Sequence, residues 1–185
     1  MPHFLNSVPI FNFIDTVGIK VTIIFLMKNK NIFVTLLLLL SFLWIGELYS
    51  QTFRVKVVKV IDGDTFTALN RDKLLLKFRM YGIDAPERGQ PFSKKSQQAL
   101  AAMIDGKRVK VTVESSDPWG RFVVKVQRGK IKDVGGELLA QGLAWHYKKF
   151  DTSQEYNNLE IEAKKLKREL WRDPNPIPPW EWRRK

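Results

Sequence analysis

The sequence predicts a small α+β domain that is mainly β, with a five-stranded barrel and about three helices. Five short segments alternate apolar and polar residues with the period of two that is typical of a half-buried strand. Other segments repeat their apolar residues at the spacing of three and four that is typical of a helix. The chain has 185 residues, of which 44% are hydrophobic, so it can bury one core of ordinary size.

The predicted strands follow one another with turn signals between them. They cover residues 53–57, 65–69, 74–83, 109–113 and 122–126. The alternation slips by one residue at Val57-Val58, which predicts a β-bulge. Asp62-Gly63 predicts a tight turn into the returning strand. Within the third strand, the period of two places Arg79 on the face away from the core. The core face of that strand carries Leu74, Leu76, Phe78 and Met80.

Three segments have the helical pattern, and the longest comes last. They cover residues 93–104, 137–141 and 152–170. In the last helix, Thr152 and Glu155 match a capping box. Its apolar stripe consists of Tyr156, Leu159, Ala163, Leu166 and Leu170, and its solvated faces carry Glu160, Lys164, Lys165, Lys167 and Arg168. Strands and helices in this order suit a Greek-key barrel of the OB type. The Pro-rich tail cannot continue the helix, and we expect it to be extended.

The chain divides into a leader over residues 1–50, the barrel domain over 51–171 and a basic tail, rich in Pro and Trp, over 172–185. From Met27, two lysines precede an apolar run over 32–46, which matches a secretory signal peptide and is shorter than the roughly twenty residues of a membrane span. We interpret Met27 as the start and residues 1–26 as an over-extended reading frame. We therefore expect export with cleavage after Ser50, and membrane anchoring only if the leader is retained.

The composition restricts the chemistry. The formal net charge is +12, and residues 1–50 hold only three of the 31 basic side chains. The positive charge therefore belongs to the domain, where it suits a polyanionic partner such as nucleic acid or simply keeps the protein soluble. There are no cysteines, which excludes disulfides, a thiol nucleophile and cysteine metal sites. Of the two histidines, His3 lies in the leader and only His146 is available. Carboxylates, arginines and a hard metal ion remain.

Two carboxylates are predicted to meet at one edge of the barrel. Asp64 opens the second strand and Asp84 follows the third, so a hairpin of these strands brings them together. Carboxylates this close raise each other's pKa unless a cation lies between them, and with a loop carbonyl and water they suit Ca²⁺ or Mg²⁺. Arg79 and Glu87 add a phosphate-binding group and a general base, which completes the requirements of phosphoryl transfer. Taken singly, each motif is more often structural than functional: Asp62-Gly63-Asp64 is typical of a turn, and Asp84-x-x-Glu87 is typical of a helix cap.

Four ordered motifs extend this pattern: Val-Ile-Asp-Gly-Asp-Thr at 60–65, Phe-Arg-Met-Tyr-Gly-Ile-Asp-Ala-Pro-Glu at 78–87, Trp-Gly-Arg at 119–121 and Gln-Gly-Leu-Ala-Trp at 141–145. They resemble the staphylococcal nuclease, or thermonuclease, family. The resemblance implies an OB-type barrel that hydrolyses DNA and RNA phosphodiesters with calcium and leaves 3′-phosphates. It also implies the residue roles: the Asp64 and Asp84 side chains and the Ala85 carbonyl as metal ligands, Glu87 as general base, and Arg79 and Arg121 as clamps on the phosphate. Trp119 and Tyr147 are candidates for stacking on a base, or are structural aromatics.

We therefore expect an exported, metal-dependent endonuclease with little sequence specificity, acting as a monomer on DNA or RNA without an obligate protein partner. The alternatives are a non-catalytic OB module that binds nucleic acid and a membrane-anchored basic protein with a structural role. The chain retains all five ligand and catalytic side chains, which favours the enzyme. We also expect Glu87→Gln and Arg79→Ala to slow the reaction with little loss of fold, because both side chains should face solvent.

Overall fold

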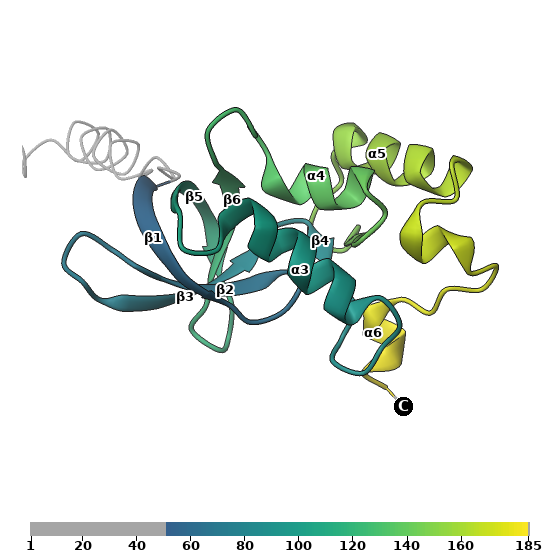
Figure 1. Ribbon diagram of the computed structural model, residues 1–185, viewed down its shortest axis with the longest axis horizontal. Coiled ribbons are helices and arrows are strands. Elements are labelled where there is room, and N and C mark those ends of the chain that lie inside the picture. The colour runs from purple at the N-terminus through teal and green to yellow at the C-terminus, as the bar shows by residue number, and fades with distance from the viewer. Residues whose placement is uncertain (1–50, 185) are drawn as a thin grey trace, which may run out of the picture. The chain divides into compact units, whose positions relative to one another are not determined.

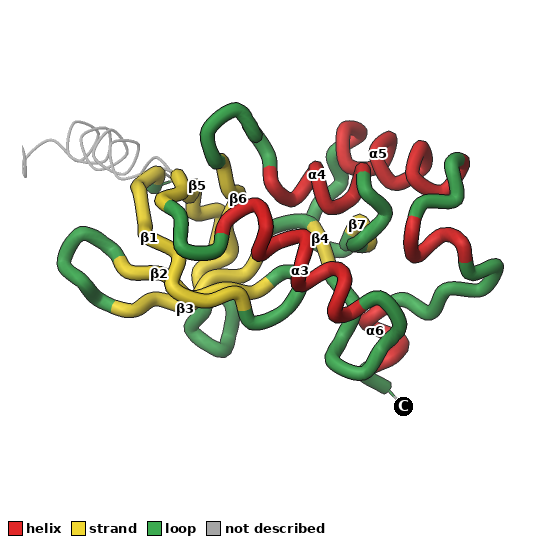
Figure 2. The backbone as a smooth tube through the Cα atoms, viewed as in Figure 1, coloured by secondary structure: helices red, strands yellow, loops and turns green. Residues whose placement is uncertain are grey.

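The computed structural model describes residues 51–184 (Figure 1). The predicted leader, with its start at Met27 and its cleavage point at Ser50, lies outside the described residues, as does Lys185. Within residues 51–184, no helix combines the length and the apolar character needed to span a membrane. This part of the chain forms one closed β-barrel flanked by helices (Figure 2).

Five strands close the barrel. They are β1 (Thr52–Val60), β2 (Thr65–Leu69), β3 (Leu75–Met80), β5 (Arg108–Ser116) and β6 (Phe122–Gln127), in the order β1-β2-β3-β6-β5. Neighbouring strands are antiparallel except β3 and β6, which run parallel. This mixed barrel confirms the predicted OB-type fold. The register of β1 against β2 shifts between Val57 and Lys59, which confirms the predicted bulge.

Alternate strand residues fill the barrel. Phe66 and Phe78 are fully buried and stack with ring centroids 5.2 Å apart, and Phe122 packs against Phe78. Two helices, α3 (Ser93–Ile104) and α4 (Val134–Ala140), add further buried side chains to the same core: Leu100, Ile104, Leu138 and Leu139. Burial of apolar surface from both layers therefore holds the barrel and these helices together.

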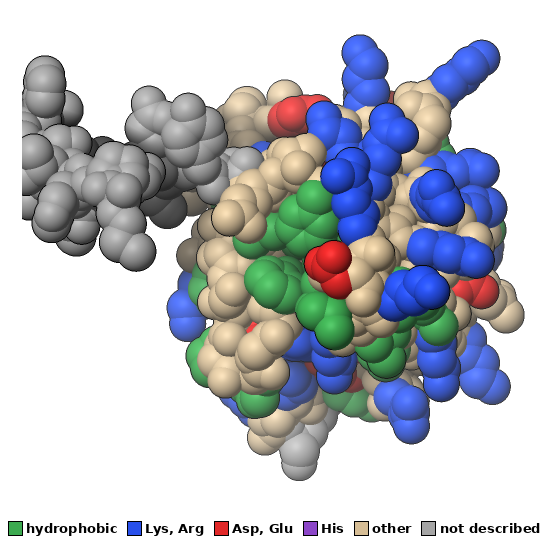
Figure 3. Space-filling view, turned by 90° about the vertical axis from the view of Figure 1, so that its left-hand side faces the viewer, with side chains coloured by type: hydrophobic (Ala, Val, Ile, Leu, Met, Phe, Trp, Pro, Cys, Tyr) green, Lys and Arg blue, Asp and Glu red, His purple; other side chains and the backbone are tan. Residues whose placement is uncertain are grey.

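The outer positions of the strands carry positive charge. Exposed lysines and arginines alternate with buried residues along the barrel strands: Arg54, Lys56, Lys59, Lys77, Arg108, Lys110 and Lys125. Figure 3 shows many Lys and Arg side chains, in blue, and few acidic ones on the face that it presents. The alternation that builds the core thus also builds a basic surface, which attracts polyanions.

The third predicted strand is divided in two. β3 ends at Met80, and a separate strand β4 (Ile83–Asp84) pairs with β7 (Trp145–His146). Gly82 between them has a φ of +71°, which a residue with a side chain rarely adopts. Leu74 was predicted on the core face but is 58% exposed. It belongs to the β2–β3 turn, where its N–H donates to Asn70 Oδ1 at 2.9 Å.

The last predicted helix is shorter than its apolar pattern. α5 runs over Gln154–Lys165 and begins after Ser153, whose hydroxyl accepts the N–H of Tyr156. Ser153 therefore caps the helix, and the capping box predicted at Thr152 is wrong. Lys167 has a positive φ of 49°, which is incompatible with a continuing right-handed helix, and the chain goes on in a 3-10 turn (Glu169–Arg172).

Glu160 was predicted to lie on a solvated face of α5, and it is buried instead. Its Oε1 accepts the backbone N–H of His146 at 3.0 Å, and its Oε2 accepts from Lys164 at 2.9 Å. Burial of a carboxylate is tolerated when it has donors and a cationic partner of this kind. The backbone N–H that Glu160 accepts belongs to β7, so the spacing of residues along the helix could not predict that Glu160 is buried.

The C-terminal tail was predicted to be extended, but part of it is helical. Pro179 starts a short helix, α6 (Pro179–Trp182), at a position where the missing N–H of proline is no loss. Trp180 stacks on Tyr147, with ring centroids 5.4 Å apart and planes 3° from parallel. The tail is thus packed against residues of the barrel domain.

We expect Gly63→Ala to destabilise the domain by about 1–3 kcal/mol. A Cβ at this position would lie 2.0 Å from Ser96 Oγ and 2.7 Å from Ala85 Cβ, so neighbours would have to move. Ser96→Ala alone should be nearly neutral, since the buried Ser96 hydroxyl has no hydrogen-bond partner among the described residues, and in combination it should recover part of the loss. Chemical denaturation measures all three variants. Wild-type stability of Gly63→Ala would contradict the close packing.

Candidate active site

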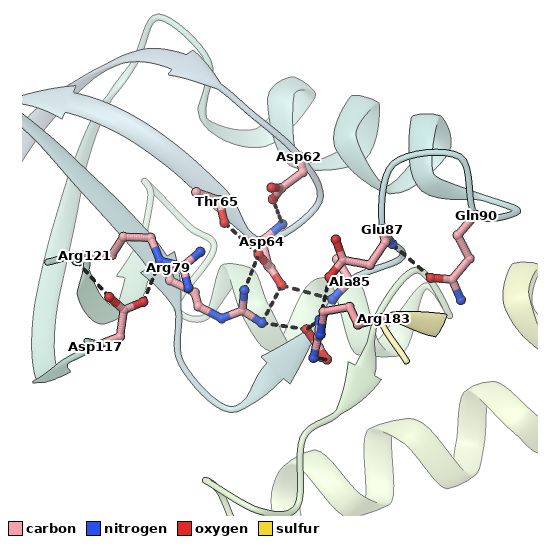
Figure 4. A network of polar contacts seen from close by, with 11 residues as sticks. Asp62, Asp64, Thr65, Arg79, Ala85, Glu87, Gln90, Asp117, Arg121 and Arg183 are labelled. Atoms are coloured by element: carbon pink, nitrogen blue, oxygen red, sulfur yellow. Dashed lines mark hydrogen bonds and ion pairs between the residues drawn. The ribbon is translucent and has the colours of Figure 1, made fainter. Parts of the chain in front are cut away.

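The register of the β2–β3 hairpin brings two acidic side chains onto one arginine. Thr65 pairs with Arg79, so Asp64 lies beside Met80, whose N–H donates to the Asp64 carbonyl at 2.8 Å. Arg79 Nη2 lies 3.1 Å from Asp64 Oδ2 and 2.5 Å from Asp84 Oδ1 (Figure 4). Both aspartates are buried, at 3% and 0% exposure. The structure therefore brings together the two side chains predicted as metal ligands.

Local hydrogen bonds fix the direction of Asp64. Thr65 Oγ1 donates to its Oδ1 at 2.8 Å, and the Ala85 N–H donates to its Oδ2 at 3.1 Å. The Asp64 N–H donates in turn to Asp62 Oδ1 at 3.0 Å, so Asp62 closes the turn that the sequence predicted. A carboxylate held on both oxygens keeps its orientation, which a binding site requires.

Negative charge is crowded at this point of the barrel. Burial, together with the nearby charge of Asp64, raises the pKa of Asp84 above its ordinary value of 3.8, although Arg183 and Arg79 oppose the rise. Burial and the same neighbour raise the pKa of Asp62 to about 6. Burial is the larger cause for both groups, so their ionised forms are costly in this position. A bound cation would favour the ionised forms.

The donor set fits a hard cation. Two buried carboxylates converge on the position where Arg79 places its guanidinium, so the site is built around positive charge. In the part of the chain that the structure describes, no three His, Cys, Asp or Glu side chains are grouped so that they could hold a metal ion. A cation here would therefore depend on Asp64, Asp84, the Ala85 carbonyl and water. These are oxygen ligands of the kind that Ca²⁺ and Mg²⁺ take.

A third carboxylate and a second arginine adjoin this pair. Glu87 follows β4, and its side chain is 37% exposed. Arg183, directly after α6, places Nη2 2.9 Å from Asp84 Oδ2 and Nη1 2.5 Å from Glu87 Oε1. Sequence reasoning assigned no role to Arg183. It lies 96 residues from Glu87, and nothing in the tail beyond its positive charge indicates the contact.

Arg121 shares the outer face of the barrel with Arg79. β3 and β6 are parallel with Arg79 opposite Val123, so Arg121 lies two residues earlier beside the same strand. Its Nε donates to Asp117 Oδ2 at 2.5 Å, and Asp117 Oδ1 accepts the N–H groups of Trp119 and Arg121. Burial raises the pKa of Asp117, but these hydrogen bonds outweigh it and the pKa is lowered. Asp117, which sequence reasoning missed, therefore stays ionised and holds Arg121.

The two candidate stacking residues lie in different surroundings. Trp119 is 78% exposed and lies beside its neighbour Arg121, whose guanidinium is 5.3 Å from the ring centroid. Tyr147 stacks on Trp180 and lines a groove of about 850 Å³ between α5 and the tail. Trp119 thus presents an exposed ring next to a predicted catalytic residue, whereas the ring of Tyr147 is engaged with the tail.

The chain is similar to known proteins. The profile of a family described as "Staphylococcal nuclease homologue" matches residues 77–173. An uncharacterized endonuclease of Haemophilus influenzae is 34% identical over 158 residues, which cover 85% of this chain and 88% of that protein. The chain belongs to the staphylococcal nuclease family. A micrococcal nuclease of Shigella flexneri is 34% identical over 143 residues, which cover 71% of this chain and 81% of that protein. A staphylococcal-like nuclease of Arabidopsis thaliana is 40% identical over 118 residues, which cover 62% of this chain and 36% of that protein.

Membership in the staphylococcal nuclease family makes this chain a nuclease, and the family is metal-dependent. The segment that matches the family profile contains Arg79, Asp84, Glu87 and Arg121. It ends ten residues before Arg183. The arginine that contacts Asp84 and Glu87 from the tail therefore lies outside the part of the chain that the family profile covers.

Arg79 is more buried than the sequence predicted. The period of two does place it off the core face, yet its side chain is only 18% exposed. The cause is its position between Asp64 and Asp84, which it bridges. The premise that Arg79 faces solvent is therefore wrong, and we now expect Arg79→Ala to destabilise the fold, because the substitution would leave buried carboxylates without their partner.

We expect Arg79→Leu to lower the free energy of unfolding of the metal-free protein by about 3 kcal/mol near neutral pH. Without the guanidinium the pKa of Asp84 rises further, so the folded state binds a proton that the unfolded state releases. The loss should therefore grow as the pH rises above about 4 and shrink below it. Urea unfolding across this range in chelator measures it, with Arg54→Leu on β1 as an exposed control. A loss independent of pH would contradict the pairing.

Proposed function

We propose that this nuclease is a divalent-cation-dependent endonuclease in which Asp64 and Asp84 hold the ion, with the Ala85 carbonyl. The convergence of two buried carboxylates on one cationic position is the observation that carries the proposal. Ca²⁺ is the ion that we propose, since every ligand is an oxygen and the family resemblance implies calcium. When bound, the ion supplies positive charge to the phosphate and to the negative charge that develops during its attack.

Glu87 supports the proposal as general base. Its carboxylate adjoins Asp84 through their shared partner Arg183, and it is exposed enough to meet water. A water molecule that gives its proton to Glu87 attacks phosphorus, while the bond from phosphorus to the leaving sugar oxygen breaks and that oxygen takes a proton from solvent. The resemblance implies that the other product keeps the phosphate on its 3′ oxygen.

Arg79 and Arg121 support the proposal as phosphate ligands. Each guanidinium offers paired donors that match phosphate oxygens and is charged at every relevant pH. Asp117 holds Arg121 on the outer face of the barrel. Arg79 can turn from its carboxylates to a phosphate once those carboxylates have another positive partner. The two arginines then stabilise the charge that accumulates on the phosphate oxygens.

A nucleic acid substrate bound without sequence preference is supported by the surface. The basic outer positions of the strands favour contacts to phosphates, which carry no sequence information. Stacking of a base on the exposed ring of Trp119 would be equally tolerant of sequence. The groove beside Tyr147 adds four lysines, Lys148, Lys149, Lys164 and Lys167. We therefore propose DNA or RNA as the substrate.

A nucleic-acid-binding module without catalysis is the second candidate. The basic barrel would be sufficient for that function. It would not require two buried carboxylates and a third beside them, since crowded negative charge opposes both folding and the binding of a polyanion. The carboxylate cluster therefore favours the enzyme.

We further propose that the enzyme is exported through the signal peptide predicted from Met27 and that it acts as a monomer. Two lysines followed by the apolar run over 32–46 are the support for export. Retention of the leader would instead anchor the enzyme to a membrane.

We expect Glu87→Gln to lower kcat on single-stranded DNA about 10²- to 10⁴-fold, because it removes the proton acceptor. DNA binding and thermal stability should change little, since the side chain is more than one third exposed. Cleavage assays in Ca²⁺ and in chelator, beside gel-shift binding, measure this. Glu114→Gln, an exposed change on β5, is the matched control. Near-normal turnover of Glu87→Gln would show that another residue is the base.

Calcium should stabilise the wild-type protein and fail to stabilise Asp84→Asn. At a concentration a hundred times the dissociation constant, binding to the folded state alone adds about 2.7 kcal/mol. Thermal unfolding with and without Ca²⁺ measures this without any assay of activity. Asp72→Asn, an exposed change in the β2–β3 turn, should keep the full stabilisation. An equal shift in Asp84→Asn would place the ion elsewhere.

A further inference from the structure

The C-terminal tail is tied to the loop that carries Glu87. Gln90 lies in this loop and is buried, at 5% exposure. Its Oε1 accepts the backbone N–H of Glu87 at 2.9 Å, and its Nε2 donates to the Ile177 carbonyl at 2.6 Å. One buried side chain thus joins the backbone of the predicted base to the backbone of the tail.

A second connection reaches the Glu87 side chain itself. Arg183 Nη1 donates to Glu87 Oε1 at 2.5 Å and to Asp84 Oδ1 at 3.3 Å, while Nη2 donates to Asp84 Oδ2 at 2.9 Å (Figure 4). The nitrogen that the two carboxylates share is therefore closer to Glu87. Charge-assisted hydrogen bonds of this kind restrict a side chain that is otherwise free to rotate. Oε2 of Glu87 is left as the oxygen that can accept a proton.

The tail is fixed well enough to direct Arg183. Trp180 stacks on Tyr147 and also packs against a buried cluster formed by Trp145, Ala163, Leu170 and Trp171. Phe92, at the end of the loop that carries Glu87, packs against the same cluster. The tail and the loop therefore pack against the same apolar cluster. Because this packing holds α6 in position, it also fixes the position of Arg183, which directly follows the helix.

We propose that Arg183 is a positioning residue for the nuclease reaction and that the tail is the brace that holds Glu87 in place. This inference rests on the proposed function, in which Glu87 is the base. A general base must lie within hydrogen-bond reach of the attacking water, and small displacements of such a group cost large factors in rate. Gln90 holds only the backbone of Glu87, whose side chain is partly exposed, and Arg183 is the residue that fixes that side chain.

Kinetics of the full-length chain on single-stranded DNA in Ca²⁺ test the proposal. Arg183→Gln should lower kcat about tenfold to a hundredfold with KM nearly unchanged, and Arg183→Lys should restore part of the loss. In a Glu87→Gln background the same substitution should have almost no further effect, because Arg183 acts through Glu87. Arg172→Gln, an exposed change of the same kind at the start of the tail, is the matched control.

A second measurement does not depend on activity. Amide hydrogen exchange of residues 85–92 in chelator should be faster in Arg183→Gln than in the wild type or Arg172→Gln, since the loop loses one of its two hydrogen-bonded connections to the tail. Unchanged exchange and unchanged kcat in Arg183→Gln would overturn the proposal.

Other kinetic results would overturn it in distinct ways. A higher kcat in Arg183→Gln would mean that the tail inhibits the enzyme, and a higher KM with the same kcat would mean that Arg183 binds substrate. The proposed function fails separately: normal turnover of Glu87→Gln would remove the base assignment. A slow Glu87→Gln beside a normal Arg183→Gln would reject the positioning role alone.

Discussion

The β2–β3 register is the constraint on which the site depends. Because Thr65 pairs with Arg79, Asp64 is brought to the end of β3, where the chain turns into β4 and delivers Asp84. Both carboxylates are buried, so bulk water solvates their ionised forms poorly, and a positive partner in the protein or bound to it stabilises them. Arg79 is that partner in this structure. A shift of one residue in the register would turn these side chains to the opposite face of the sheet and remove the site.

The same barrel separates charge of opposite sign. Its outer strand positions are basic, while Asp64, Asp84 and Glu87 gather beside β4, where Arg79 and Arg183 contact them. The surface as a whole therefore attracts a polyanion. The acidic site would repel a phosphate unless positive charge lies between the carboxylates and the phosphate. The placement of charge therefore supports the proposed cation, as does membership in a metal-dependent family.

Local patterns predicted the barrel and the central pair of the site. Strand alternation, the Asp62-Gly63 turn and the spacing of Asp64, Arg79 and Asp84 are local features, and a hairpin converts them directly into contacts. Features that depend on distant partners were missed. Glu160 is buried because β7 supplies a donor, and Arg183 reaches Glu87 across 96 residues. The exposure of Arg79 was misjudged for the same reason, since the period of two assigns a face and says nothing of what covers it.

A crystal structure of the chain grown with calcium tests the central claim most directly. The account predicts density for one ion bound by an oxygen of Asp64 and an oxygen of Asp84, with the Arg79 guanidinium moved away from the point where it now bridges the two. Glu87 should remain in contact with Arg183. An ion bound at another place, or an unmoved Arg79 between carboxylates that take no ion at saturating calcium, would contradict it.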